Sequence, residues 1–241
     1  MEIITSRGNA RLKHLCKLID DKDYRYTCGE YVVEGRRALS ACSGVKALYL
    51  RAGVIAPMVG CDSIFFVEEK LFATIAPTEN SQGILAIVPL RISGPDAIKK
   101  TARYVFLDHL KDPGNAGTII RSACAFGIDG VIVTPGCVDP FSPKVVRSSA
   151  GMVSSIEIIR IDNLSSLDSC FVLALAAGGQ DVRTVSWPAW FVLAVGSEDQ
   201  GVAPELRGRA QVVVGIPMQK SAESINAAVA AGIALFAAYG T

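Results

Sequence analysis

Three nearly uninterrupted apolar runs in the second half of the chain restrict its fold more than any other feature. They read CFVLALAA (170–177), WFVLAV (190–195) and AQVVVG (210–215). Apolar runs of this length, without alternating polar residues, are typical of strands covered on both faces, and such strands occur mainly in parallel sheets. We therefore expect an α/β fold with a mainly parallel sheet and helices on both of its faces.

Further elements complete two successive α/β alternations. In the second half, strands are expected at 104–108, 130–135 and 155–161, and helices at 115–127, 142–151 and 224–239. In the first half, a helix is expected at 7–20 and strands at 31–34, 47–50, 63–69 and 83–90. The stretch between them holds Gly-Pro, mixed charge and no sustained periodicity, which is typical of a domain boundary. We expect a small α/β domain at 1–92, a linker at 93–102 and a second domain at 103–241.

Composition narrows the class of protein. Half of the 241 residues are hydrophobic, which is enough for a sizeable core, yet no apolar run is long and uncharged enough to span a membrane. The seven cysteines are odd in number and form no CxxC pair, so free thiols in a reducing compartment are expected. Two histidines cannot build a multi-histidine metal site. We expect a cytoplasmic protein without a metal or a membrane partner.

Charge is uneven along the chain. The net charge is only +1, but residues 1–51 hold ten Lys and Arg against six acidic residues. This excess has two interpretations, a surface that faces phosphates or an ordinary solvated helix face, and composition alone favours the second.

Three polar loops follow strands of the second domain, where open parallel sheets bind ligands. The first reads DPGNAGTIIRSACAFG, with Asn115 in the expected cap position and Arg121 about 9 Å further along the helix, either solvated or reaching back. The second, GSEDQG, offers Gly196, where backbone can approach a ligand, and the carboxylate of Glu198, but it also reads as a plain turn. The third, IPMQKSAESIN, places Ser224 as an expected helix cap and Asn226 in the first turn.

Together the three loops resemble the three motifs of the SpoU (TrmH-type) branch of the SPOUT RNA methyltransferases. NAGTIIRSACAFG is similar to the first motif, LAVGSEDQG to the second and VGIPMQKSAESINAAVA to the third, with Ile225 where Leu is usual. DPFSPKVVRSSAG resembles the segment that commonly lies between them. SRGNARLKHLCKL and YVVEGRRAL resemble a substrate-binding domain similar to ribosomal protein L30e.

The resemblance implies transfer of a methyl group from S-adenosylmethionine to a ribose 2′-hydroxyl in RNA, by a homodimer whose second domain contains a trefoil knot. It implies catalytic roles for Asn115, Arg121, Glu198, Ser224 and Asn226, and cofactor contacts by Gly196, Ile216, Met218 and Ile225. With an L30e-like domain implied, the candidates for RNA contact are Arg7, Asn9, Arg11, Lys13, Glu34, Arg36 and Arg37.

The full N-terminal domain favours ribosomal RNA as the substrate. The alternatives are a transfer RNA substrate and a non-catalytic RNA-binding or ribosome-assembly protein of the same fold. The presence of all five expected catalytic residues argues against the non-catalytic alternative.

Overall fold

The computed structural model describes residues 3–197, 199–219, 221 and 223–239. The chain forms two compact units, Met1–Arg91 with Asp139–Ser155, and Ile92–Val138 with Ile156–Thr241. The first unit thus receives an insertion from the second half of the chain, which the sequence did not suggest. The division into domains at 1–92 and 103–241 stays a prediction.

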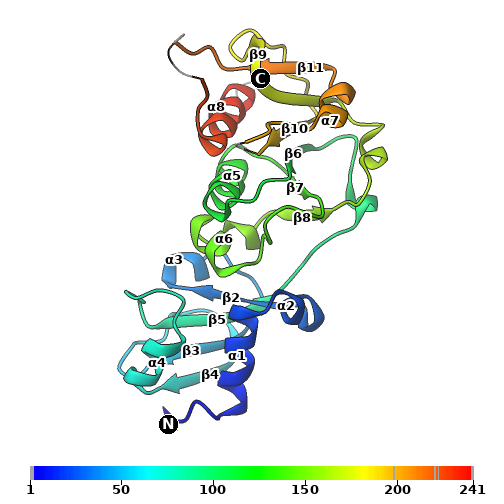
Figure 1. Ribbon diagram of the computed structural model, residues 1–241. Helices are drawn as coiled ribbons and strands as arrows, with labels where there is room; N and C mark the ends of the chain where they lie inside the picture. Colours follow the sequence, from blue (N-terminus) through cyan, green and yellow to red (C-terminus); the bar gives the residue numbers. More distant parts are fainter. Residues whose placement is uncertain (1–2, 198, 220, 222, 240–241) are drawn as a thin grey trace. The chain divides into compact units, whose positions relative to one another are not determined.

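The second unit is built on a six-stranded sheet in the order β11-β9-β10-β6-β7-β8 (Figure 1). Every neighbouring pair in this sheet is parallel. All six expected strands are confirmed, as β6 (Arg103–Asp108), β7 (Gly130–Val133), β8 (Glu157–Arg160), β9 (Val172–Asp181), β10 (Phe191–Gly196) and β11 (Val212–Gly215).

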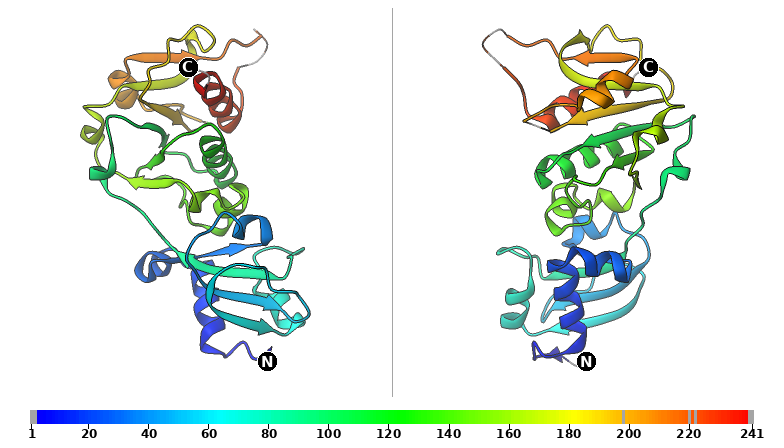
Figure 2. Two further views of the ribbon diagram at one scale, coloured as in Figure 1. Left: turned by 180° about the vertical axis from the view of Figure 1, so that it is seen from behind. Right: turned by 45° about the vertical axis from the view of Figure 1, so that its right-hand side comes forward.

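Helices cover both faces of this sheet. Side chains alternate along each strand, so Val192 and Ala194 of β10 enter one core with Leu206 of α7 (Pro204–Arg209). The short helices η1 (Pro95–Ala97) and η3 (Leu164–Leu167) close the same side. On the other side α8 (Ala227–Tyr239) packs on β9 and β10, and α5 (Pro113–Ala125) lies beside α8 (Figures 1 and 2).

The first unit contains a five-stranded mixed sheet in the order β1-β4-β3-β5-β2. β5 runs antiparallel to β2 and β3, and β4 runs parallel to β3 and β1. The strands are β1 (Ile3–Ile4), β2 (Glu30–Glu34), β3 (Val45–Arg51), β4 (Cys61–Val67) and β5 (Ile84–Pro89). The helices are α1 (Ala10–Asp20), α2 (Lys22–Cys28), α3 (Arg36–Leu39), α4 (Glu69–Ile75), α6 (Pro143–Ser148) and η2 (Met152–Ser154). The expected helix at 7–20 begins only after its cap, Asn9.

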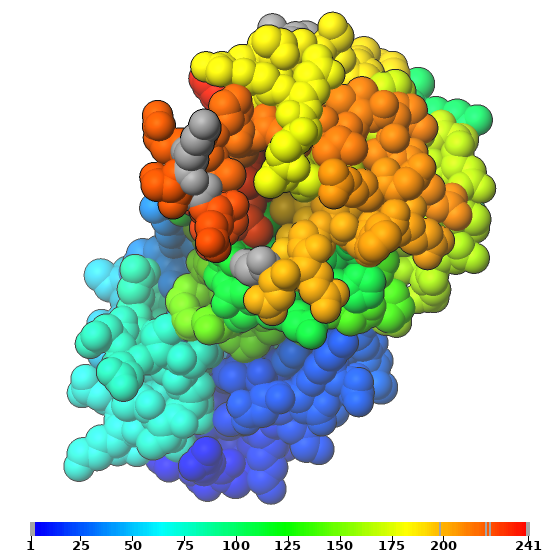
Figure 3. Space-filling model, turned by 45° about the horizontal axis from the view of Figure 1, so that its top comes forward, coloured from blue at the N-terminus to red at the C-terminus, as the bar shows by residue number. Residues whose placement is uncertain are grey.

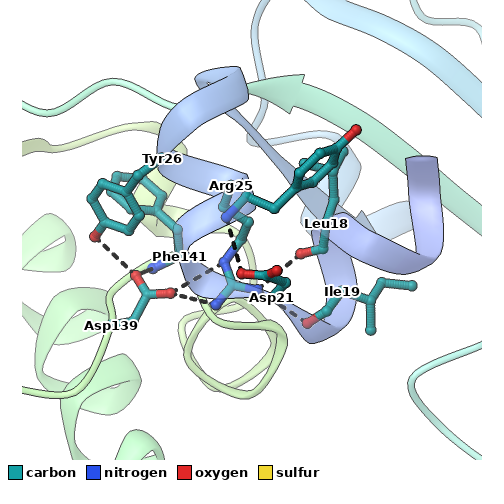
Figure 4. Close-up of polar contacts among 8 residues, drawn as sticks. Leu18, Ile19, Asp21, Arg25, Tyr26, Asp139 and Phe141 are labelled. Atoms are coloured by element: carbon teal, nitrogen blue, oxygen red, sulfur yellow. Dashed lines mark hydrogen bonds and ion pairs between the residues drawn. The ribbon is translucent and has the colours of Figure 1, made fainter. Parts of the chain in front are cut away.

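A buried ion pair holds the inserted segment Asp139–Ser155 in the first unit (Figure 4). Arg25 is 4% exposed and Asp139 is 8% exposed, and their side chains approach to 2.6 Å. Arg25 also donates to two carbonyl oxygens of α1, and Tyr26 donates to the second oxygen of Asp139. Such a pair is favourable only when its hydrogen-bonding groups are satisfied, as they are here, and loss of one partner is costly.

Two expectations from composition can be compared with the structure. All seven cysteines are free, as expected, but each is half-buried and not fully buried. Within the part of the chain that the structure describes, no helix is both long and apolar enough to cross a bilayer.

Candidate cofactor and acceptor site

The three polar loops meet at one edge of the parallel sheet. β6 and β10 are neighbours in register, with Asp108 opposite Gly196 at their carboxyl ends. β11, which ends at Gly215, lies two strands from β10 in the same sheet, with β9 between them. Because parallel strands all end at the same edge, the described parts of the following loops, at 109–112, 199–203, 216–219 and 223–226, lie at that edge.

A cavity of about 460 Å³ lies at this edge. Figure 3 looks onto the hollow between the yellow and the orange-red segments of the second unit. All four residues expected to contact the cofactor line the cavity, as do two of the expected catalytic residues: Gly196, Ile216, Met218, Ile225, Ser224 and Asn226. Its walls are mainly apolar side chains and strand-end backbone, and its size falls in the range of small-molecule sites.

The lack of a side chain at Gly196 permits a close backbone contact. An added Cβ would lie 1.9 Å from the carbonyl carbon of Gly201, which has a φ of +67°. The loop folds back here through an antiparallel bridge between Ser197 and Gly201. The sequence predicts that this glycine lets backbone approach a ligand, whereas its closest neighbour in the structure is the backbone of Gly201.

Asn115 and Asn226, which are 111 residues apart in sequence, are joined by a hydrogen bond. The Asn226 amide donates to Asn115 Oδ1 at 2.9 Å. The Asn226 side-chain oxygen also accepts from the backbone N–H groups of Ala228 and Val229 in the first turn of α8. The structure therefore brings the first and third motifs together through one side chain.

Both helix caps differ from the expectation. Asp112, not Asn115, caps α5, because Pro113 takes the first helical position and the Asp112 carboxylate accepts from the Asn115 N–H. Asn226, not Ser224, supplies the cap oxygen of α8, since that helix begins three residues later than expected. In both cases the cap is the residue that directly precedes the first residue of the helix.

Arg121 is exposed on α5, and its guanidinium makes no hydrogen bond or ion pair with another described residue. The expected approach of Arg121 to the Asn115 loop is therefore not present as a direct contact. Glu198, the remaining expected catalytic residue, lies outside the described residues.

Asp108 and Arg207 belong to this site although the sequence analysis did not select them. Asp108 is 3% exposed; one carboxylate oxygen accepts from the Ala203 N–H at 2.6 Å and the other lies 2.7 Å from Nδ1 of His109. It thus ties the 197–203 loop to the end of β6. Asp108 could have been selected from the sequence, because it is an acidic residue at the end of an otherwise apolar strand. Arg207 lines the cavity from α7 and had no comparable signal.

Several of the expected RNA-contacting residues already have partners within the first unit. Asn9 caps α1, and Arg11 lies over the Phe65 ring at 4.5 Å. Glu34 accepts from Thr78, and the Arg36 guanidinium donates to the carbonyl of Ile55. The side chains of Arg7, Lys13 and Arg37 are exposed.

Comparison with known proteins agrees with this geometry. The sequence model of the SpoU rRNA Methylase family matches residues 102–236. A 23S rRNA (guanosine-2′-O)-methyltransferase of Bacillus subtilis is 29% identical, over 98% of both chains. An AdoMet-bound rRNA methyltransferase from Sinorhizobium meliloti has a TM-score of 0.85 at 32% identity, covering 98% of this chain and 97% of that one. The SpoU methyltransferase AviRb from Streptomyces viridochromogenes, in complex with AdoMet, has a TM-score of 0.84 at 25% identity, covering 96% and 97%.

These matches confirm the resemblance and the α/β class that the sequence predicts. The trefoil knot and the individual roles of the site residues stay predictions.

Proposed function

Because the chain belongs to the SpoU rRNA methylase family, we propose that it transfers a methyl group from S-adenosylmethionine to a ribose 2′-hydroxyl of ribosomal RNA. The observation that carries this proposal is the cavity at the carboxyl edge of the sheet, whose lining includes Asn226, the hydrogen-bond partner of Asn115. The Bacillus subtilis relative, similar over nearly its whole length, is named for this reaction on 23S rRNA. Ribosomal RNA as the substrate makes the cytoplasm the expected location.

The cavity suits the cofactor in size and in chemistry. Ile216, Met218 and Ile225 would hold the adenine between apolar surfaces, and the strand-end backbone beside Gly196 would offer hydrogen bonds to its edge. Arg207 offers a cation to a carboxylate at the other end of such a ligand. When bound, S-adenosylmethionine supplies a methyl group already activated by its sulfonium charge.

The chain's own residues would then position the acceptor. A ribose hydroxyl is very weakly acidic, so its placement supplies much of the rate. Asn115, Asn226 and Ser224 would orient the ribose beside the cavity. Arg121 stays protonated under ordinary conditions, so its contribution would be to stabilise the developing negative charge on the hydroxyl oxygen or to hold the adjacent phosphate.

A homodimer is part of the same proposal. α8 carries exposed apolar side chains at Val229, Ile233 and Phe236, spaced so that they share one face, and Phe236 is 69% exposed. Phe236 packs edge-on against Phe126, which follows α5. A stripe of this kind on a terminal helix suits a second copy of the chain.

The proposed reaction is tested by supplying the protein with S-adenosylmethionine carrying a labelled methyl group and with deproteinised ribosomal RNA. A 2′-O-methyl group blocks alkaline cleavage of the adjacent phosphodiester, so the label should be recovered in alkali-resistant dinucleotides. Label in mononucleotides would indicate base methylation instead. Transfer only to transfer RNA would change the substrate, and RNA binding without any transfer would support the non-catalytic alternative.

A further inference from the structure

The first unit contains a second cavity, of about 410 Å³, that no part of the proposed reaction uses. Its lining comes from three stretches distant in sequence, namely the N-terminal region with α1, the end of α4, and the start of α6. All of these stretches belong to the same compact unit.

The lining of this cavity is strongly basic. It includes Arg7, Lys144 and Arg147 against a single acid, Asp20. None of the three cations forms an ion pair with any residue that the structure describes. Burial raises the pKa of the Cys16 thiol in the same lining; the positive charge of Arg7 opposes this rise and the negative charge of Asp20 adds to it.

A buried hydroxyl in the lining also lacks a partner. Ser142 Oγ is inaccessible to solvent and makes no hydrogen bond with a described residue. Because Oγ has no solvent-accessible surface, an anion in the cavity would contact the cations and not this hydroxyl. A cavity lined by three cations suits an anion that accepts hydrogen bonds from Lys and Arg.

The segment that contributes Ser142, Lys144 and Arg147 is fixed at both ends. Asp139 is held by Arg25 in the buried ion pair of Figure 4, and Ser154 is hydrogen-bonded to the Tyr31 hydroxyl at 2.5 Å. Between these anchors Val145 and Val146 of α6 are buried. The cations are therefore presented by a preorganised segment, which lowers the entropy lost on binding.

We propose that this cavity binds a backbone phosphate of the RNA substrate, with Arg7, Lys144 and Arg147 as its cations. The inference rests on the proposed function for the identity of the ligand. Phosphate contacts fix the register of a nucleic acid without reading its sequence. Lys144 and Arg147 lie within the residues that the methylase family model matches, yet they belong to the first unit. The proposed phosphate site therefore combines cations from both halves of the sequence.

The test compares two double variants that each remove two positive charges. Lys144→Gln with Arg147→Gln alters the cavity, whereas Lys70→Gln with Arg160→Gln removes exposed cations that do not line it. Binding to a mixed-sequence RNA hairpin is measured over a range of salt concentrations. Loss of this one phosphate contact lowers the log–log salt slope by about 0.7, so the wild-type advantage over the cavity variant should shrink about 2.6-fold between about 50 and 200 mM salt.

A cavity variant with the salt slope of wild type, or of the control variant, would overturn the inference. A second measurement needs no variant: acetylation of lysines by an amine-specific reagent, with and without the hairpin. RNA should protect Lys144 and leave Lys70 unprotected, and equal modification of Lys144 in both conditions would also overturn it.

The outcome is separable from that of the proposed function. If wild type transfers no methyl group to any RNA, while RNA binding by the cavity variant depends less on salt than binding by wild type, the proposed reaction is wrong and the phosphate site stands. If wild type methylates ribosomal RNA and the cavity variant binds RNA normally, the site is wrong and the reaction stands.

Discussion

Asn226 has two separable structural roles, and this makes it the most informative position for a substitution. Its side-chain oxygen caps α8, and its side-chain N–H group donates to Asn115. Aspartate has the same shape and keeps an oxygen for the cap, but when ionised it has no donor for Asn115. Alanine loses both.

The two variants should differ sharply in stability. Loss of the cap in Asn226→Ala should cost about 1 kcal/mol, and loss of the exposed hydrogen bond about 0.5 kcal/mol more. In a chain of this size the total of about 1.5 kcal/mol should lower Tm by about 3–6 °C. In Asn226→Asp the negative charge at the helix N-terminus should return about 0.3–1 kcal/mol, which offsets the lost hydrogen bond, so Tm should stay near that of wild type.

Activity should not follow stability. Both variants should transfer methyl groups poorly, because neither can hold Asn115 in its present orientation. Thermal unfolding by circular dichroism and labelled methyl transfer measure the two effects. Asn163→Ala is the matched control, since it removes a comparable cap from η3, where Asn163 accepts from the Ser165 N–H. Near-normal turnover by Asn226→Asp would refute the link between the Asn pair and the reaction, and equal destabilisation by Asp and Ala would refute the capping role.

Four further predictions concern separate parts of the molecule. Arg121→Ala should reduce methyl transfer by about 10²–10³-fold with cofactor affinity and Tm unchanged, and normal turnover would make it a surface residue. Gly196→Ala should displace the 197–203 loop, because its Cβ would lie 1.9 Å from that loop's backbone, and calorimetry should show cofactor binding weakened by about tenfold or more. Asp139→Ala should leave the charge of Arg25 buried and unpaired and destabilise the first unit by about 3–5 kcal/mol in urea unfolding, with a smaller loss for Asp139→Asn. Phe236→Asp should give a monomer in sedimentation experiments, and an unchanged mass would exclude this face of α8 as the dimer contact.

Strands could be predicted from the sequence with little loss. Each of the three apolar runs at 170–177, 190–195 and 210–215 forms a strand, since a strand without polar residues can be accommodated only where both of its faces are covered. The short helix α2 was not expected. Its sequence, KDYRYTC, has no apolar stripe, and the helix is bounded by local caps: the Asp21 carboxylate accepts from the Tyr24 N–H, and Gly29 ends the helix in the left-handed conformation. Arg25 in this helix is buried only because Asp139, 114 residues later, neutralises it.

Some features of the candidate site could likewise be predicted from the sequence, and others could not. Six residues lining the proposed cofactor cavity were predictable because their motifs follow strand ends, and strand order places strand ends together, whereas Arg207 was not. The caps were not, since Asp112 and Asn115 are equally good capping residues and the position of Pro113 in the folded helix decided between them.

By itself, the sequence determined the class of fold, the six strands of the parallel sheet and the polar loops that follow three of them, because these depend on local composition and on apolar runs that no polar residue interrupts. The tertiary structure alone decided that the segment Asp139–Ser155 packs with the first unit, that Asn226 bonds to Asn115, and that Lys144 and Arg147 share a cavity with Arg7. Each of these pairings joins residues more than 100 positions apart. Their free energy arises only when the chain has already folded, so no local pattern in the sequence records them.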